Sequence, residues 1–288
     1  MGRAAAMATT GMILMASAAL GQTVAPPPEE VVVASPVATS GETVLVPGIA
    51  EIQFSPRFWY LFESYGQPNR RISPNSFATN NGDEFALGGA SVSARFNFLP
   101  ETIFVLTGLY GTNGPAPAQN ESFTESPPSV LQNTNNTNRI DIELLAISKI
   151  PNHDWAWIAG GRFERHDDTF TNTLFLPNSP PSNFKTTGSV SLYSGKAGLL
   201  AGVPLTADAN LRLFGNIMAV VGVGSESAGP NFGFVGPDAS IGLQYTFSPT
   251  ISADMRYRVF VYFPFSAPPG TPSYVVYQGP MIGVNFKF

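Results

Sequence analysis

The chain has 288 residues, of which 43% are apolar but only 12% are charged, and its formal net charge is −5 at pH 7. Soluble globular domains carry about 25% charged residues, and an acidic chain offers no basic footprint for nucleic acid. The 28 Gly and 26 Pro disfavour a mostly helical fold, and the absence of Cys excludes disulfides and thiolate chemistry.

Residues 1–21 have the pattern of a secretory signal peptide. Arg3 supplies a positive start, an uncharged apolar run follows, and small residues predict cleavage before Gln22, with a cut after Ala19 as the alternative. The apolar run is shorter than the roughly 20 residues that a membrane helix needs. We therefore expect the protein to leave the cytoplasm.

Residues 22–50 are rich in Pro, Val, Ala and Thr and show no helical periodicity. This composition predicts a disordered, extended periplasmic segment. A passive linker and a binding segment for a periplasmic partner are the two interpretations, and the linker is favoured.

From residue 51 to residue 288 apolar and polar positions alternate in ten segments, which is the period of a β-strand. The segments are 51–65, 85–98, 102–111, 138–150, 155–166, 188–203, 210–224, 237–248, 251–264 and 274–288. Their connections are alternately long and short, which is typical of outer-membrane barrels. The sequence predicts an all-β, closed, antiparallel up-and-down transmembrane β-barrel of ten strands. Eight strands are an alternative, as are twelve if 112–137 or 167–187 contains a further hairpin.

Charged side chains within one segment share the same face. Arg139, Asp141 and Glu143 alternate with apolar residues, and a charge that faces lipid costs about 2–4 kcal/mol at mid-membrane. We therefore assign these charges to the lumen. The predicted lumen-lining residues are Arg95, Arg139, Asp141, Glu143, Arg162, Glu164, Lys196, Arg212, Asp238, Asp254, Arg256 and Arg258. Arg165 falls on the opposite face of its segment from Arg162 and Glu164, so we expect it above the lipid. The segment 102–111 carries no charge that would assign its outward face.

Aromatic residues on the predicted outward face gather near the segment ends, as in interfacial girdles. They are Phe96, Phe98, Trp155, Trp157, Tyr245, Phe247, Phe286 and Phe288 on the short-turn side and Tyr60, Phe62, Phe163, Tyr193 and Tyr257 on the loop side. A soluble barrel would reverse which face is wet, and the girdles disfavour it.

The final segment, 282–288, alternates up to Phe288 and resembles the carboxy-terminal signal of bacterial outer-membrane barrels. The resemblance implies integral insertion in a bacterial outer membrane. It also implies outer-membrane lipid and the barrel assembly machinery as partners.

Three further pieces resemble the Legionella-type major outer-membrane, pore-forming family. They are Arg139-Ile140-Asp141-Ile142-Glu143-Leu144, Trp157-Ile158-Ala159-Gly160-Gly161-Arg162 and Gly279-Pro280-Met281-Ile282-Gly283-Val284. The resemblance implies a pore-forming function and no particular site.

Catalytic groupings are sparse. His166-Asp167-Asp168 lies where a strand meets a long loop, the position at which outer-membrane proteases place an Asp and His pair, but a second acidic pair is not evident. We interpret this run as a solvated cluster at the rim. The sequence predicts no enzyme, no catalytic residue, no cofactor and no metal site.

The predicted interior holds more basic than acidic side chains, and such charges must pair when they are removed from water. Ten strands lie near the size at which side chains fill a barrel. The favoured function is a narrow pore for small, anionic solutes. The alternatives are a non-conducting structural or surface-interaction barrel that acts through its outer loops, especially 113–138, and an outer-membrane hydrolase that depends on His166.

Overall fold

The computed structural model describes residues 48–66, 84–113, 119–123, 129–175, 180–227, 231–266 and 273–288. The predicted signal peptide, and the Pro-rich segment up to residue 47, lie outside these ranges. None of the described residues forms a helix that is long and apolar enough to cross a membrane.

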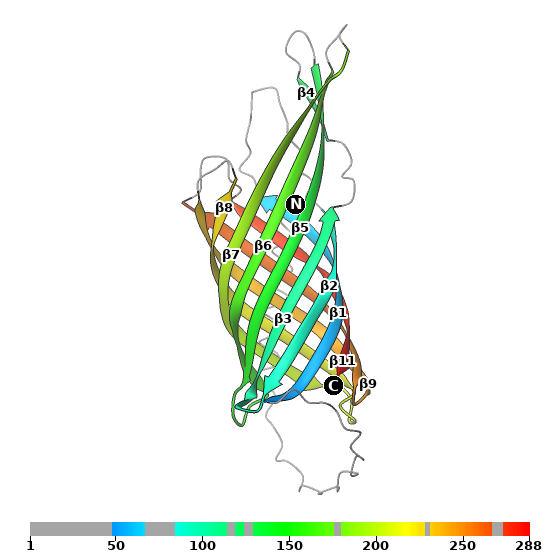
Figure 1. The fold of residues 1–288 in the computed structure, drawn as a ribbon, viewed down its shortest axis with the longest axis vertical. Coiled ribbons are helices and arrows are strands. Elements are labelled where there is room, and N and C mark those ends of the chain that lie inside the picture. Colours follow the sequence, from blue (N-terminus) through cyan, green and yellow to red (C-terminus); the bar gives the residue numbers. More distant parts are fainter. Residues whose placement is uncertain are drawn as a thin grey trace, which may run out of the picture. The chain divides into compact units, whose positions relative to one another are not determined.

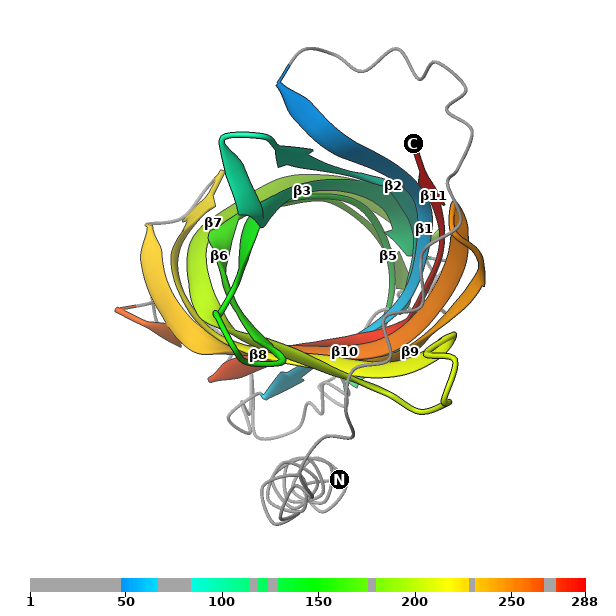
Figure 2. The same ribbon diagram turned by 90° about the horizontal axis from the view of Figure 1, so that it is seen from below.

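The described residues form eleven strands in one antiparallel sheet. The strands are β1 (Ile49–Gly66), β2 (Glu84–Phe96), β3 (Leu99–Asn113), β4 (Gln119–Phe123), β5 (Ser129–Lys149), β6 (Trp155–Phe175), β7 (Ser182–Pro204), β8 (Leu211–Glu226), β9 (Phe232–Ser248), β10 (Ile251–Phe265) and β11 (Tyr274–Lys287). All but β4 close into a ring of ten, because β1 pairs with β11 and β3 pairs with β5 (Figures 1 and 2). The predicted closed, ten-stranded, antiparallel barrel is confirmed.

The two faces of the sheet have opposite chemistry. In β10, Asp254 and Arg258 are buried in the interior, whereas Met255 and Tyr257 between them are exposed on the outside. The charge-free strand β3 follows the same rule, with Leu109 inside and Leu106 outside. The barrel therefore presents large apolar side chains outward, the reverse of a soluble barrel.

The ends of the barrel differ in their connections. Residues 97–98, 150–154, 205–210 and 249–250 make the short connections, and we call this end the turn end. It is the lower end in Figure 1, and the opposite end is called the loop end. Asn152 and Ala209 have positive φ angles of 61° and 55° in two of these turns.

Several strands are longer than the sequence pattern predicts, and β5, β6 and β7 exceed their predicted segments by the most residues at the loop end. Strands β5, β6 and β7 have 21, 21 and 23 residues and extend past the other strands at the loop end, where β4 pairs with β5 (Figure 1). The segments 138–150, 155–166 and 188–203 are therefore too short at that end. The missed stretches are rich in Asn and Thr and lack apolar alternation, yet their backbones pair continuously, with Thr134 opposite Thr171 and Phe170 opposite Thr186.

Candidate functional site: the barrel interior

The interior contains a charged group formed by neighbouring side chains of β5 and β6. Arg139 Nη2 lies 2.9 Å from Glu164 Oε1, and Arg162 bonds both Glu164 at 2.9 Å and Asp141. The register places Asp141 directly opposite Glu164, so the strand pairing itself brings the carboxylates and guanidinium groups together. All four side chains are almost completely removed from solvent.

A second charged group reaches across the barrel. Arg258 of β10 contacts Asp238 at 2.6 Å and Glu143 of β5 at 2.7 Å. Lys196 of β7 joins the same two carboxylates, with 2.9 Å between its Nζ and Asp238 Oδ2. Strands β5 and β10 lie diametrically opposite in the ring of ten, so the Arg258–Glu143 pair spans the lumen.

Aromatic side chains fill the space around these charges and toward the loop end. The Arg139 guanidinium lies 4.2 Å from the ring centre of Tyr277, and that of Arg162 lies 4.8 Å from the ring centre of Phe260. We call the buried cluster on this side the aromatic plug. Its members are Trp59, Leu61, Phe85, Leu87, Leu109, Leu192, Val220, Phe232, Phe234, Phe260, Tyr262, Val275, Tyr277 and Met281.

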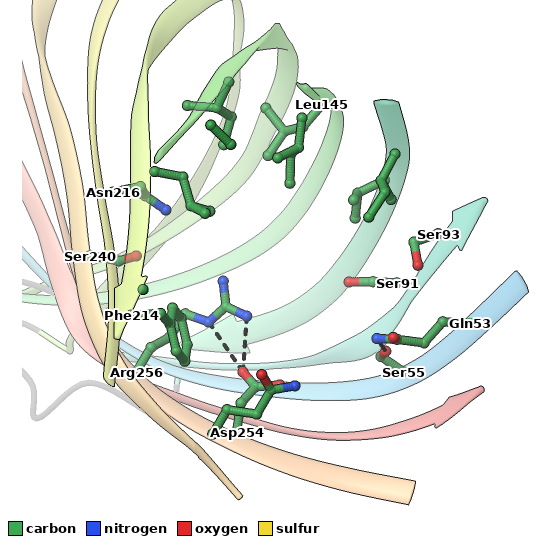
Figure 3. Close-up of a pocket in the computed structure, with 18 of the residues that line it drawn as sticks. Gln53, Ser55, Ser91, Ser93, Leu145, Phe214, Asn216, Ser240, Asp254 and Arg256 are labelled. Carbon is green, nitrogen blue, oxygen red and sulfur yellow. Dashed lines mark hydrogen bonds and ion pairs between the residues drawn. The ribbon is translucent and has the colours of Figure 1, made fainter. Parts of the chain in front are cut away.

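The turn half of the interior is open. A cavity of about 780 Å³ extends from the charged groups to turn-end residues such as Glu101 and Asp154. Figure 3 shows the cavity with Ser91, Ser93 and Asp254 on its wall. Interior space on this side is therefore lined by side chains and not filled by them.

The structure places all the predicted lumen-lining residues on the inward face. Nine of them are buried: Arg139, Asp141, Glu143, Arg162, Glu164, Lys196, Asp238, Asp254 and Arg258. The other three, Arg95, Arg212 and Arg256, line the turn-end cavity. The aromatic plug is not among the predicted lumen-lining residues. Its inward position is visible in the alternation, because Trp59 lies on the same strand face as Arg57, and Phe260 on the same face as Arg258.

His166 is not part of a solvated rim cluster, and that interpretation is wrong. The side chain is 8% exposed, its Nε2 lies 2.9 Å from Glu164 Oε1, and its ring lies between Phe85 and Tyr277 at 6.2 and 6.0 Å. Glu164 and His166 are two residues apart on β6 and point to the same face, so the histidine lies next to the buried charged group. It does not line the turn-end cavity, where a substrate would have room.

The aspartates beside His166 have other partners. Asp168 accepts a hydrogen bond from the Thr137 hydroxyl at 2.6 Å, and Asp167 pairs with Arg165 at 2.9 Å on the exposed outer face. Within the described residues, no three His, Asp or Glu side chains gather in a way that could hold a metal ion.

Comparisons with known proteins give structural likeness alone. No family model and no curated protein matches this sequence, so the resemblance to the Legionella-type family has no support from these searches. Among solved structures, the outer-membrane protease OmpT from Escherichia coli is 11% identical, with a TM-score of 0.46 over 86% of this chain and 100% of that one.

Two other outer-membrane barrels show a weaker likeness. The attachment invasion locus protein Ail of Yersinia pestis is 13% identical, with a TM-score of 0.34 over 83% of this chain and 98% of that one. The Neisserial surface protein NspA is 10% identical, with a TM-score of 0.32 over 82% and 97%. At these values no activity transfers to this chain.

Proposed function

We propose that this chain is an integral barrel of a bacterial outer membrane that does not conduct solutes and acts at the cell surface through its three projecting strands. The apolar outer face supports the membrane location, because side chains such as Ile217 and Leu144, 62% and 52% exposed, would be unfavourable in water. The observation that carries the non-conducting state is the bridge of side chains across the lumen.

The bridge joins opposite walls at two levels. Arg258 of β10 binds Glu143 of β5, and His166 of β6 lies against Tyr277 of β11, which is the strand opposite β6 in the ring. The side chain of Trp59, between these two contacts, has no exposed surface. A solute moving along the axis would have to displace these groups.

Displacing the bridge is energetically costly. Separating one partner from a buried ion pair costs about 3–5 kcal/mol, because the remaining charge stays in a site that excludes water. The two charged groups hold several such pairs, and aromatic rings fill the space beside them. This supports the surface-interaction alternative over the narrow pore for anionic solutes that the sequence favours. The pore stays a prediction, and the turn-end cavity is the feature that favours it.

The projecting strands supply the surface. Their extensions carry the runs QNTNNTN at 132–138 and TFTNT at 169–173, which are rich in uncharged hydrogen-bonding side chains. The paired backbones hold these runs beyond the other strands at the loop end, where the short-turn topology predicts the cell exterior. A continuously paired sheet of polar composition suits contact with a polar macromolecular surface.

A shortened sheet tests this role. Deleting Thr134–Asn135, Phe170–Thr171 and Lys185–Thr186 removes two facing residues from each strand and keeps both register and alternation. The extension then loses about 7 Å of reach at roughly 3.3 Å per residue. Cells that display the shortened barrel should lose aggregation and attachment relative to cells with the full chain.

The control is folding of the shortened barrel. Gel migration with and without boiling shows whether it still inserts as a closed barrel, and surface labelling shows equal display. Unchanged attachment by a folded, equally displayed variant would overturn the surface role.

A further inference from the structure

The turn-end cavity has one apolar wall inside a barrel lumen. Val105, Leu145, Ile147, Ile158 and Met218 form a cluster on the strands β3, β5, β6 and β8, and each also lines the cavity. Leu145 is seen on this wall in Figure 3. Lumens that hold only water are lined by polar side chains, so this wall suits an apolar guest.

The facing wall is polar and carries ordered charges. Arg57 and Arg256 both bind Asp254, and Asn285 donates a hydrogen bond to the same carboxylate at 3.0 Å. Arg256 lies over the ring of Phe214 at 5.1 Å, across β9, where Gly242 has no side chain to obstruct it. One carboxylate thus serves two guanidinium groups, which leaves a positive excess at this wall.

The cavity as a whole is also positive. Its lining includes six basic and four acidic side chains, namely Arg57, Arg95, Lys149, Arg212, Arg256 and Arg258 against Glu101, Glu143, Asp154 and Asp254. Among the described residues Arg212 has no acidic partner within ion-pair distance. A guest that carries negative charge is therefore favoured over a neutral one of the same shape.

Two polar groups on the cavity wall lack hydrogen-bond partners among the described residues. Ser240 is 4% exposed, and its Oγ makes no hydrogen bond within the described part of the chain, nor does Oδ1 of Asn216. The register places these residues directly opposite each other on β9 and β8, and Figure 3 shows both on the cavity wall near Phe214 and Arg256. Buried polar groups are normally paired, so this corner is suited to a polar head group.

We propose that the turn-end cavity binds an anionic, single-chain amphiphile. Its head group is held by Arg256 with Ser240 and Asn216, and its hydrocarbon chain lies along the apolar wall that includes Val105 and Leu145. The volume of about 780 Å³ lies within the range of roughly 300–1,000 Å³ that small-molecule sites occupy. The cavity reaches the turn end, so the ligand enters from the side of the short turns.

Binding is tested with dodecanoate as the probe and native mass spectrometry of the full barrel in a non-ionic detergent. We expect one saturable adduct per barrel. Dodecanol lacks the charge and acetate lacks the chain, so each should bind at least roughly tenfold more weakly.

Two variants locate the site, and one matched variant controls for surface charge. Arg256→Gln and the double variant Ser240→Val with Asn216→Leu should each weaken the dodecanoate adduct roughly tenfold. Arg165→Gln removes an exposed guanidinium of β6 that does not line the cavity, and it should change nothing. Gel migration before and after boiling confirms that each variant is folded.

Three results would overturn the proposal. They are the absence of a saturable adduct, equal binding of dodecanoate and dodecanol, or equal binding by Arg256→Gln and the unaltered chain. Equal binding in these comparisons would mean that dodecanoate simply partitions into detergent or onto the apolar outer face of the barrel. The proposal does not depend on the surface role of β5–β7, because it concerns the opposite end of the barrel.

Discussion

The two halves of the barrel interior use the same strands but reach different solutions for buried space. Toward the loop end, ten closed strands surround aromatic rings and paired charges that leave little room. Toward the turn end, the same strands surround a cavity of about 780 Å³ with a mixed lining. The difference lies in side-chain size at inward positions, since β1 presents Trp59 and Leu61 in one half but Gln53 and Ser55 in the other.

This comparison explains why a strongly charged interior can be stable. In the closed half each buried guanidinium has carboxylate partners and aromatic neighbours, which offset part of the cost of its removal from water. In the open half a shortage of carboxylates is tolerable, because water or a ligand can reach the arginines. Substitutions in matched pairs, one in each half, therefore test whether the two halves differ in this way.

The largest effect is expected from removing a carboxylate of the closed half. Asp238→Ala leaves Lys196 and Arg258 with Glu143 as their shared carboxylate, and should lower the free energy of unfolding by about 3–5 kcal/mol. Asp254→Ala, in the open half, should cost clearly less. Guanidinium unfolding in detergent, followed by tryptophan fluorescence, measures both, and equal losses would contradict the division of the interior.

Truncating an aromatic ring should follow the same order. Phe234 is 1% exposed within the aromatic plug, so Phe234→Ala should cost about 3 kcal/mol by leaving a cavity. Phe214→Ala enlarges a cavity that already exists and should cost less. The same unfolding measurement compares them, and a larger loss for Phe214→Ala would show that the turn half is packed as tightly.

The outer face gives a third comparison. Leu144 is 52% exposed and lies between the two aromatic girdles, since Phe163 faces Ile142 and Trp157 faces Ser148 across β5 and β6. Leu144→Arg should therefore cost about 2 kcal/mol through lipid exposure. Ser93→Arg, which faces the cavity, is the control and should be nearly neutral. Refolding yield into vesicles tests this, and a neutral Leu144→Arg would argue against a lipid-facing belt.

The smallest effect concerns the exposed turn before β8. The Thr206 hydroxyl and the Asn210 backbone N–H donate hydrogen bonds to Asp208, which lowers the pKa of its carboxyl below the ordinary value. A lowered pKa in the folded state adds stability above the unfolded pKa, and that stability is lost as the pH falls through the folded value. Asp208→Asn should remove this slight acid sensitivity, as unfolding midpoints between pH 6 and pH 2 would reveal.

The barrel could be predicted from sequence because its outer face imposes a strict rule. Lipid tolerates few charges, so residues such as Arg139 and Arg256 reveal which parity is inward, and the ten strands follow in order. The extensions of β5–β7 escaped the rule because lipid does not constrain residues such as Thr134 and Thr171, and polar runs resemble loops.

The state of the lumen could not be predicted in the same way. Parity assigns Trp59 and Tyr277 to the interior but gives no information on whether they meet. Their packing depends on strand stagger, which brings side chains of opposite walls to one height. For the same reason His166 resembled a rim residue in the sequence, although its ring lies against Tyr277 in the structure.

We propose that side chains seal the loop half of the lumen, and single-channel recording in planar bilayers measures whether the seal holds. The unaltered barrel should give no conductance steps at high protein loading. The triple variant Trp59→Ala, Phe260→Ala and Tyr277→Ala, folded by the gel criterion, should give small, reproducible steps because it removes three nearly fully buried rings of the plug. Reproducible steps from the unaltered chain would contradict the claim and favour a narrow pore.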